Sequence, residues 1–197
     1  MAFFTNFSVR GYIGLLDWYT ISIAIFAASI LAAHGASYLA LKTEGPLHDR
    51  SSQCAKYLWA AIVPLLIAVS VESWMVRPDV PRHAIHNPFC WLGSLTIIVA
   101  TCTLILGLRL RVEEWAFLGS NFLLVGLLAT GGAAIFPVML HSTLAPENSL
   151  TAYAVAAGRN SLLLASIWWP VGFALATAYF VFISRRFAGR VSVKQDT

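Results

Sequence analysis

This chain of 197 residues is 58% apolar and only 11% charged, and its mean hydropathy is +0.73. Such a composition lies outside the range of ordinary soluble domains and is typical of an integral membrane protein. The net charge of +4 could indicate a nucleic-acid partner, but the sequence contains neither a basic stripe interleaved with aromatic residues nor zinc-finger spacing. We therefore expect no nucleic-acid partner.

The apolar residues form five long segments, each long enough to cross the roughly 30 Å hydrocarbon layer as a helix. Continuous apolarity favours helices over a β-barrel, because a spanning helix satisfies its own backbone hydrogen bonds. The sequence therefore predicts an all-α integral membrane bundle of five transmembrane helices in a single domain, residues 1–197. We expect the spans at about 17–41, 57–76, 89–108, 115–140 and 160–184, with Asp17 as the N-cap of the first.

Lysine and arginine residues are unevenly distributed between the two sides of these spans. Four of the 13 fall on one side: Arg10, Arg77, Arg82 and Arg159. The other nine fall on the opposite side, which the positive-inside rule identifies as cytoplasmic: Lys42, Arg50, Lys56, Arg109, Arg111, Arg185, Arg186, Arg190 and Lys194. The distribution predicts an external N-terminus and a cytoplasmic C-terminus. Residues 1–16 lack the short apolar core of a cleavable signal peptide.

The few polar residues inside the predicted spans are candidate sites, because ionisable groups in hydrocarbon are costly and usually face a bundle interior. His34 and Tyr38 lie four residues apart on one helix face; a hydrogen bond from His34 to a neighbouring helix is the favoured interpretation, and proton or ligand handling the alternative. Glu72 is expected to pair with Arg77 at the interface, and Asn121 to cross-link helices. These four residues form a candidate intramembrane polar path: His34, Tyr38, Glu72 and Asn121.

No catalytic constellation, nucleotide-binding loop or metal-ligand spacing appears in the sequence. Cys54, Cys90 and Cys102 fall at different depths, so we expect none of them to pair. His34 has no second intramembrane histidine at matching depth, as a haem with two histidine ligands would require. The sequence thus predicts no catalytic, cofactor-binding or metal-binding residue on this chain.

Three blocks resemble subunit II of the cytochrome bd-type quinol oxidases. The first is "HGASYLALKTEGPLHDR" at 34–50, the second "GGAAIFPVMLHSTLAPENSLTAYAVAAGRNSLLL" at 131–164, and the third "YFVFISRRFAGRV" at 179–191. They follow one another in the family's order and cover most of the chain. The resemblance marks these residues as family-motif or docking candidates: Gly35, Lys42, Thr43, Glu44, Gly45, Arg50, Phe136 and Pro137.

The resemblance implies an enzyme of the bacterial or archaeal plasma membrane that oxidises a quinol and reduces dioxygen to water in aerobic respiration. Haems b and d are then expected on subunit I, and this chain is expected to stabilise subunit I without a catalytic residue of its own. Some family members also hold a structural quinone. The family's early Asp-Gly-Phe-Asp motif is missing, so the chain resembles the carboxy-terminal part of the subunit; a split subunit whose amino-terminal helices come from another chain, a truncation and a fragment remain open.

The sequence leaves two other classes of protein as alternatives. A small membrane transporter would need broken helices or paired polar residues at the bilayer midplane, and the spans offer little beyond Pro64 and Asn121. A stand-alone membrane cytochrome would need paired intramembrane histidines.

The segment Lys42-Thr43-Glu44-Gly45 is expected to fix the inner end of the first helix. Gly45 can adopt the left-handed conformation that often ends a helix, and Lys42 suits the negative end of the helix dipole. Thr43 and Glu44 can bond to freed backbone groups or to a neighbouring basic group. We expect this turn to help dock the chain against its partners, with a solvated loop as the alternative.

Overall fold

The computed structural model describes residues 16–142 and 145–189. Five of its helices are long and apolar enough to cross a membrane, which confirms the predicted fold class. They are α1 (Trp18–Lys42), α2 (Pro46–Val76), α4 (Pro88–Leu110), α5 (Glu113–Ile135) and α6 (Arg159–Arg186). The described residues divide into two compact units, 16–136 and 137–189.

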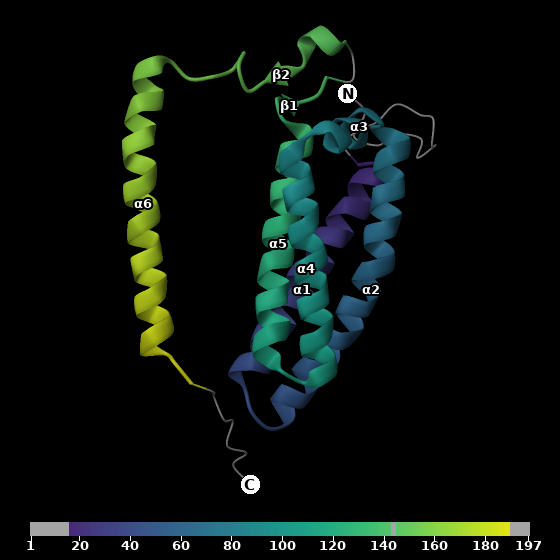
Figure 1. Cartoon of the computed structure of the whole chain (residues 1–197), viewed down its shortest axis with the longest axis vertical. Coiled ribbons are helices and arrows are strands. Elements are labelled where there is room, and N and C mark those ends of the chain that lie inside the picture. The colour runs from purple at the N-terminus through teal and green to yellow at the C-terminus, as the bar shows by residue number, and fades with distance from the viewer. Residues whose placement is uncertain (1–15, 143–144, 190–197) are drawn as a thin grey trace. The chain divides into compact units, whose positions relative to one another are not determined.

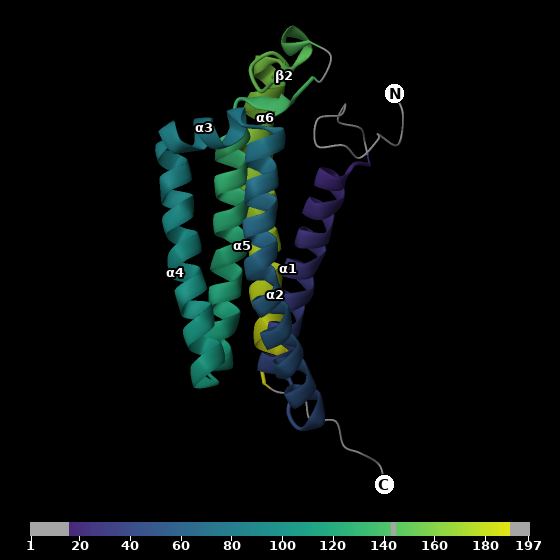
Figure 2. The ribbon, with the colours of Figure 1, turned by 90° about the vertical axis from the view of Figure 1, so that its right-hand side faces the viewer.

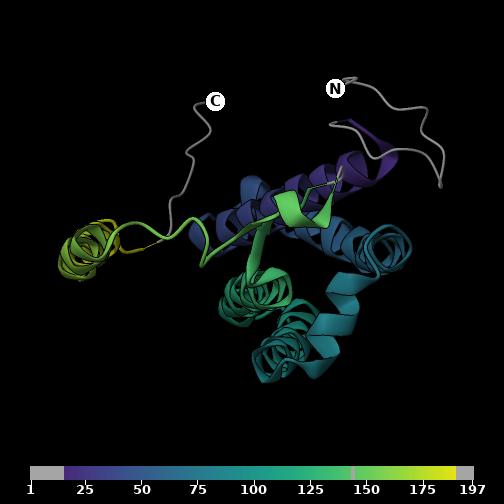
Figure 3. The ribbon, with the colours of Figure 1, turned by 90° about the horizontal axis from the view of Figure 1, so that it is seen from above.

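In the first unit, four long helices lie side by side (Figures 1 and 2). The α1–α2 and α4–α5 turns lie at one end of the bundle, and the short helix α3 (Asp79–His86) crosses the opposite end between α2 and α4 (Figure 1). Seen from above, α4 and α5 are viewed end on while α1 runs at a slant to them (Figure 3). The hydropathy of the sequence did not predict α3 as a separate element.

The start of α1 is fixed by a capping box at Asp17, as expected. The Asp17 carboxylate accepts a hydrogen bond of 2.8 Å from the Thr20 backbone amide, and the Asp17 amide donates to Thr20 Oγ1 over 3.1 Å. These bonds satisfy amides that have no partner within the helix, which stabilises the helix start.

Two helices differ in extent from the predicted spans. Helix α2 begins at Pro46 rather than near residue 57, because proline suits the first position of a helix and the polar residues after it continue the helix before the apolar span. Helix α5 ends at Ile135 rather than near residue 140. Phe136 is extended, as expected for a residue that precedes a proline, and residues 138–140 form a strand instead.

The second unit combines a small hairpin with the last long helix. Strands β1 (Val138–Leu140) and β2 (Leu150–Thr151) are antiparallel, with Val138 opposite Thr151, and the 3-10 helix η1 (Pro146–Asn148) lies between them in sequence. The Ala152 amide extends the pairing by donating a 2.8 Å hydrogen bond to the Pro137 carbonyl. Helix α6 then begins at Arg159.

The core of the first unit is made largely of small side chains, which lets the helices approach closely. On α1 the buried residues include Ala33, Ala36 and Ala40, and Ala55 of α2 is also buried. Helices α4 and α5 are in close contact at glycines. A Cβ atom placed on Gly119 would lie 2.5 Å from the backbone nitrogen of Leu104, so this position accommodates no side chain without separating the helices.

Candidate functional site

A polar and aromatic cluster, formed by His34, Tyr38, Phe117 and Ser120, joins α1 to α5. His34 Nδ1 lies 2.8 Å from Ser120 Oγ, and its ring stacks on Phe117 with the centroids 5.2 Å apart. Tyr38, one turn further along α1, packs against the same phenyl ring at 5.6 Å. The favoured interpretation of His34, a hydrogen bond to a neighbouring helix, is confirmed.

The hydrogen bonds of Ser120 define the role of His34 in this cluster. The Ser120 hydroxyl donates its single hydrogen to the Phe117 carbonyl over 2.7 Å. His34 Nδ1 must therefore carry the hydrogen it shares with Ser120, and in the neutral ring Nε2 is the acceptor. The cluster thus fixes both the orientation and the tautomer of the ring.

Asn121 does not cross-link helices as predicted. Its side-chain amide donates a 2.9 Å hydrogen bond to the Phe117 carbonyl of its own helix. The side chain therefore satisfies its amide within α5, although the Phe117 carbonyl is also the acceptor for Ser120 in the His34 cluster.

Glu72 lies toward the opposite end of the bundle from the α1–α2 turn, and the predicted pair with Arg77 does not form. Ser22 of α1 donates a 3.2 Å hydrogen bond to Glu72 Oε1, while Arg77 pairs with Asp79 at 2.8 Å. The hydrogen bond from Arg77 to Asp79 raises the pKa of the Arg77 guanidinium. Asp79 attracts this arginine because both lie where α2 passes into α3, only two residues apart.

The four residues of the candidate polar path thus lie in separate contacts. Ser22, the partner of Glu72, and His34 are twelve positions apart on α1, which corresponds to about 18 Å along a helix. Between them, the described residues give no continuous series of hydrogen bonds. His34 and Tyr38 share one cluster, and Asn121 bonds to a residue of that cluster.

The Lys42–Gly45 turn ends α1 through Thr43, whose predicted bond to a freed backbone group is present, and not through Gly45. Thr43, not glycine, is the C-cap: it is buried and extended, and both its amide and its hydroxyl donate to the Leu39 carbonyl, over 3.0 and 2.7 Å. Gly45 has the expected positive φ of 70°, but it precedes α2 rather than closing α1. Lys42 lies in the last turn of α1, and Glu44 is exposed.

His48 connects three helices just after this turn. Its Nδ1 donates a 2.8 Å hydrogen bond to the Ala40 carbonyl of α1, and its Nε2 lies 3.5 Å from a carboxylate oxygen of Glu113 in the first turn of α5. Because Nδ1 is a donor, Nε2 can also donate to Glu113 only when the ring is protonated. The contact holds the α1–α2 turn next to the α4–α5 turn.

The remaining candidates have simple surroundings. Gly35 is half-buried and has open space beside it, and Arg50 is exposed on the second turn of α2. Phe136 is the C-cap of α5, and the Pro137 carbonyl belongs to the hairpin. The three cysteines are free, as expected, and within residues 16–142 and 145–189 no three His, Cys, Asp or Glu side chains gather as metal ligands.

Sequence reasoning missed Phe117, Ser120, Trp59 and His48, which make several of the contacts between helices. Trp59 is buried, and its indole nitrogen donates a 3.0 Å hydrogen bond to Ser37 of α1. In the sequence, Trp59 resembles an interfacial tryptophan and His48 a loop histidine. Only the three-dimensional packing identifies their partners.

The fold and these contacts define a multi-pass α-helical membrane protein whose polar side chains hold helices together. The sequence matches the family described as "Cytochrome bd terminal oxidase subunit II" over residues 2–187, and the chain belongs to this family.

Two curated relatives agree with this assignment. The chain is 25% identical to "Cytochrome bd-I ubiquinol oxidase subunit 2" of Escherichia coli (strain K12) over 166 residues, which cover 70% of this chain and 43% of that protein. It is 22% identical to "Probable cytochrome oxidase subunit 2" of Haemophilus influenzae over 204 residues, which cover 90% of this chain and 53% of the relative. The chain therefore spans about half the length of the curated relatives it matches.

Proposed function

We propose that this chain is a supporting subunit of a cytochrome bd-type oxidase, which couples the oxidation of a membrane quinol to the reduction of dioxygen to water. The observation that carries the proposal is the family match, which extends over residues 2–187. In this proposal the chain stabilises a haem-bearing subunit I in a bacterial or archaeal plasma membrane and supplies no catalytic residue.

His34 has no second intramembrane histidine among the described residues, as a haem with two histidine ligands would require. The His34 ring is stacked on Phe117 and hydrogen-bonded through Nδ1 to Ser120. The other described histidines lie outside the apolar spans, with His48 in the first turn of α2, His83 and His86 on α3, and His141 after β1. This arrangement supports haems b and d on the partner subunit rather than on this chain.

The proposal is tested by deleting the gene for this chain in its source organism and measuring haem absorbance and oxygen uptake in the isolated membranes. We expect the haem d absorbance and quinol-dependent oxygen uptake to fall together, and re-expression of the full chain to restore both. Unchanged haem d and oxygen uptake in the deletion strain would reject the supporting role.

The proposed orientation, with an external N-terminus and a cytoplasmic C-terminus, gives a separate prediction. Reporter domains fused after Gly45 and after Val191 should both read cytoplasmic, and one fused in the 141–159 loop should read external, because the excess of basic residues favours the cytoplasm. An external reading of the reporter fused after Gly45 would contradict the proposed orientation.

The Glu44 side chain is proposed to dock against a partner subunit. Because it is exposed and forms no ion pair within the described chain, Glu44→Ala should change the free energy of unfolding of the isolated chain by less than about 0.5 kcal/mol. Recovery of subunit I on a tagged Glu44→Ala chain should nevertheless be largely lost, since breaking a buried ion pair costs roughly 3–5 kcal/mol, which weakens binding more than about a hundredfold. Undiminished recovery would place the turn in solvent.

A further inference from the structure

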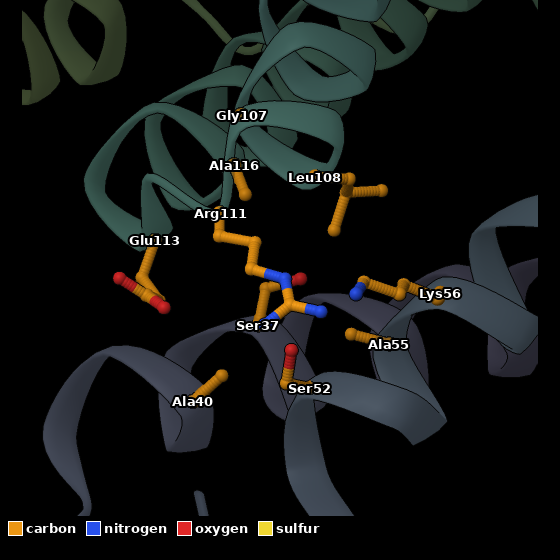
Figure 4. Close-up of a pocket in the computed structure, with 10 residues that line it drawn as sticks. All are labelled: Ser37, Ala40, Ser52, Ala55, Lys56, Gly107, Leu108, Arg111, Glu113 and Ala116. Atoms are coloured by element: carbon orange, nitrogen blue, oxygen red, sulfur yellow. The ribbon is translucent and has the colours of Figure 1, made fainter. Parts of the chain in front are cut away.

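Two openings in the first unit adjoin each other. One is an apolar groove and the other has charged side chains in its lining. The larger is a groove of about 400 Å³ between α1, α2, α4 and α5, with apolar walls that include Val63, Leu66 and Leu104. Its volume is within the range typical of ligand sites. The smaller opening, of about 20 Å³, has both charged and small apolar side chains in its lining (Figure 4). Lys56 and Leu108 line both openings, so the groove and the smaller opening adjoin each other.

Positive charges gather where the two openings join. Figure 4 shows the Arg111 guanidinium and the Lys56 ammonium group extending into the same space beside the Ser52 hydroxyl. Arg109 lines the groove as well. Within the described part of the chain none of these three cations forms an ion pair. Like charges brought together repel one another, so the arrangement favours an anion between them.

The one acidic side chain that lines the smaller opening is directed elsewhere. Glu113 lies 3.5 Å from His48, and its carboxylate stands apart from the two cations in Figure 4. The charged side chains that line the opening, Lys56, Arg111 and Glu113, therefore sum to a net charge of +1.

The backbone at Arg111 shows how its side chain reaches the opening. Arg111 is the C-cap of α4 and has left-handed dihedral angles, φ 56° and ψ 39°, the only positive φ of a non-glycine residue among those described. Glycine adopts this conformation more easily than arginine. The turn thus presents a long cationic side chain at a position where the backbone alone favours glycine.

We propose that the first unit binds one anionic glycerophospholipid, with its phosphate between Lys56 and Arg111 and an acyl chain in the apolar groove. The ligand must be amphipathic, because the cations stand at one end of walls that are otherwise apolar. A quinone carries no charge to match the two cations, and a free phosphate would leave the groove unfilled. The inference depends on the chain lying in a membrane, not on its role in an oxidase.

The test measures lipid binding by the purified full chain after delipidation in a neutral detergent. Native mass spectrometry compares phosphatidylglycerol with phosphatidylcholine of the same acyl chains. We expect Lys56→Gln and Arg111→Gly each to weaken phosphatidylglycerol binding about fivefold and to leave phosphatidylcholine unchanged, as expected for removal of one basic contact at a membrane surface. Arg111→Gly suits the left-handed backbone, so its loss of binding would not reflect misfolding.

Lys42→Gln is the matched control, because Lys42 lies at the same end of the bundle but lines neither opening. The affinity of Lys42→Gln for phosphatidylglycerol should stay within about twofold of that of the unaltered chain, since a solvent-screened surface charge contributes little to binding. Ile105→Trp replaces an aliphatic side chain in the groove wall by a larger aromatic one, so it should weaken binding of both lipids. Equal binding of the two lipids by the unaltered chain, full displacement by inorganic phosphate, or a stoichiometric quinone that phosphatidylglycerol does not displace would each overturn the proposal.

Discussion

Gly119→Ala is expected to destabilise the first unit by about 3 kcal/mol, the upper end of what overpacking usually costs. The added methyl group would lie 2.5 Å from the backbone nitrogen and 2.8 Å from the Cα of Leu104, and 2.9 Å from the Ala100 carbonyl oxygen. Backbone atoms cannot rotate away as a flexible side chain can, so α4 and α5 must separate. The free energy of unfolding, measured by titrating the purified chain with a denaturing detergent, gives the effect.

Gly131→Ala is the matched control on the same helix. A Cβ atom at Gly131 would meet nothing within 4 Å, so only the higher helix propensity of alanine acts, and stability should rise by up to about 1 kcal/mol. Equal losses at Gly119 and Gly131 would show that the close contact between α4 and α5 does not limit what position 119 accepts.

Trp59→Ala should lower the free energy of unfolding by about 3–5 kcal/mol, because it removes a large buried side chain and leaves a cavity. Trp59 is only 5% exposed and donates a 3.0 Å hydrogen bond to Ser37, which in turn donates to the Ala33 carbonyl over 2.9 Å. Trp59→Phe retains much of the apolar contact but loses the hydrogen bond to Ser37. The lost hydrogen bond should lower the free energy of unfolding by about 1 kcal/mol, in addition to the effect of the lost contact.

Trp74→Ala provides the comparison for Trp59→Ala. Trp74 lies on the same helix, but it is 49% exposed, so its removal should change stability by less than about 1 kcal/mol in detergent. A loss at Trp74 as large as that at Trp59 would show that the α1–α2 contact is not where Trp59 contributes.

The length and apolarity of the spans were enough to predict the five helices, because a helix in hydrocarbon must satisfy its own backbone and cannot be short. Apolarity did not locate the helix ends. The polar turns after Pro46 are helical, and the helix through Gly131 and Gly132 stops before Pro137, so local backbone preferences set these boundaries.

The partners of polar side chains were harder to predict than the helices. His34 was expected to reach a neighbouring helix and does, but spacing along α1 could not show that this helix is α5 or that Ser120 is the partner. Arg77 had two carboxylates within reach in the sequence, and the passage from α2 into α3 brings Asp79 to it rather than Glu72. Such choices depend on the angle at which helices cross.

The most direct test of the proposed supporting role is to measure where the haem resides after purification through a tag on this chain. The assembly should show the reduced-minus-oxidised spectrum of haems b and d together with a second polypeptide, and this chain expressed without that polypeptide should contain no stoichiometric haem. Stoichiometric haem on the isolated chain, with an absorbance band that disappears in His34→Ala, would contradict the account and identify the chain as a cytochrome itself.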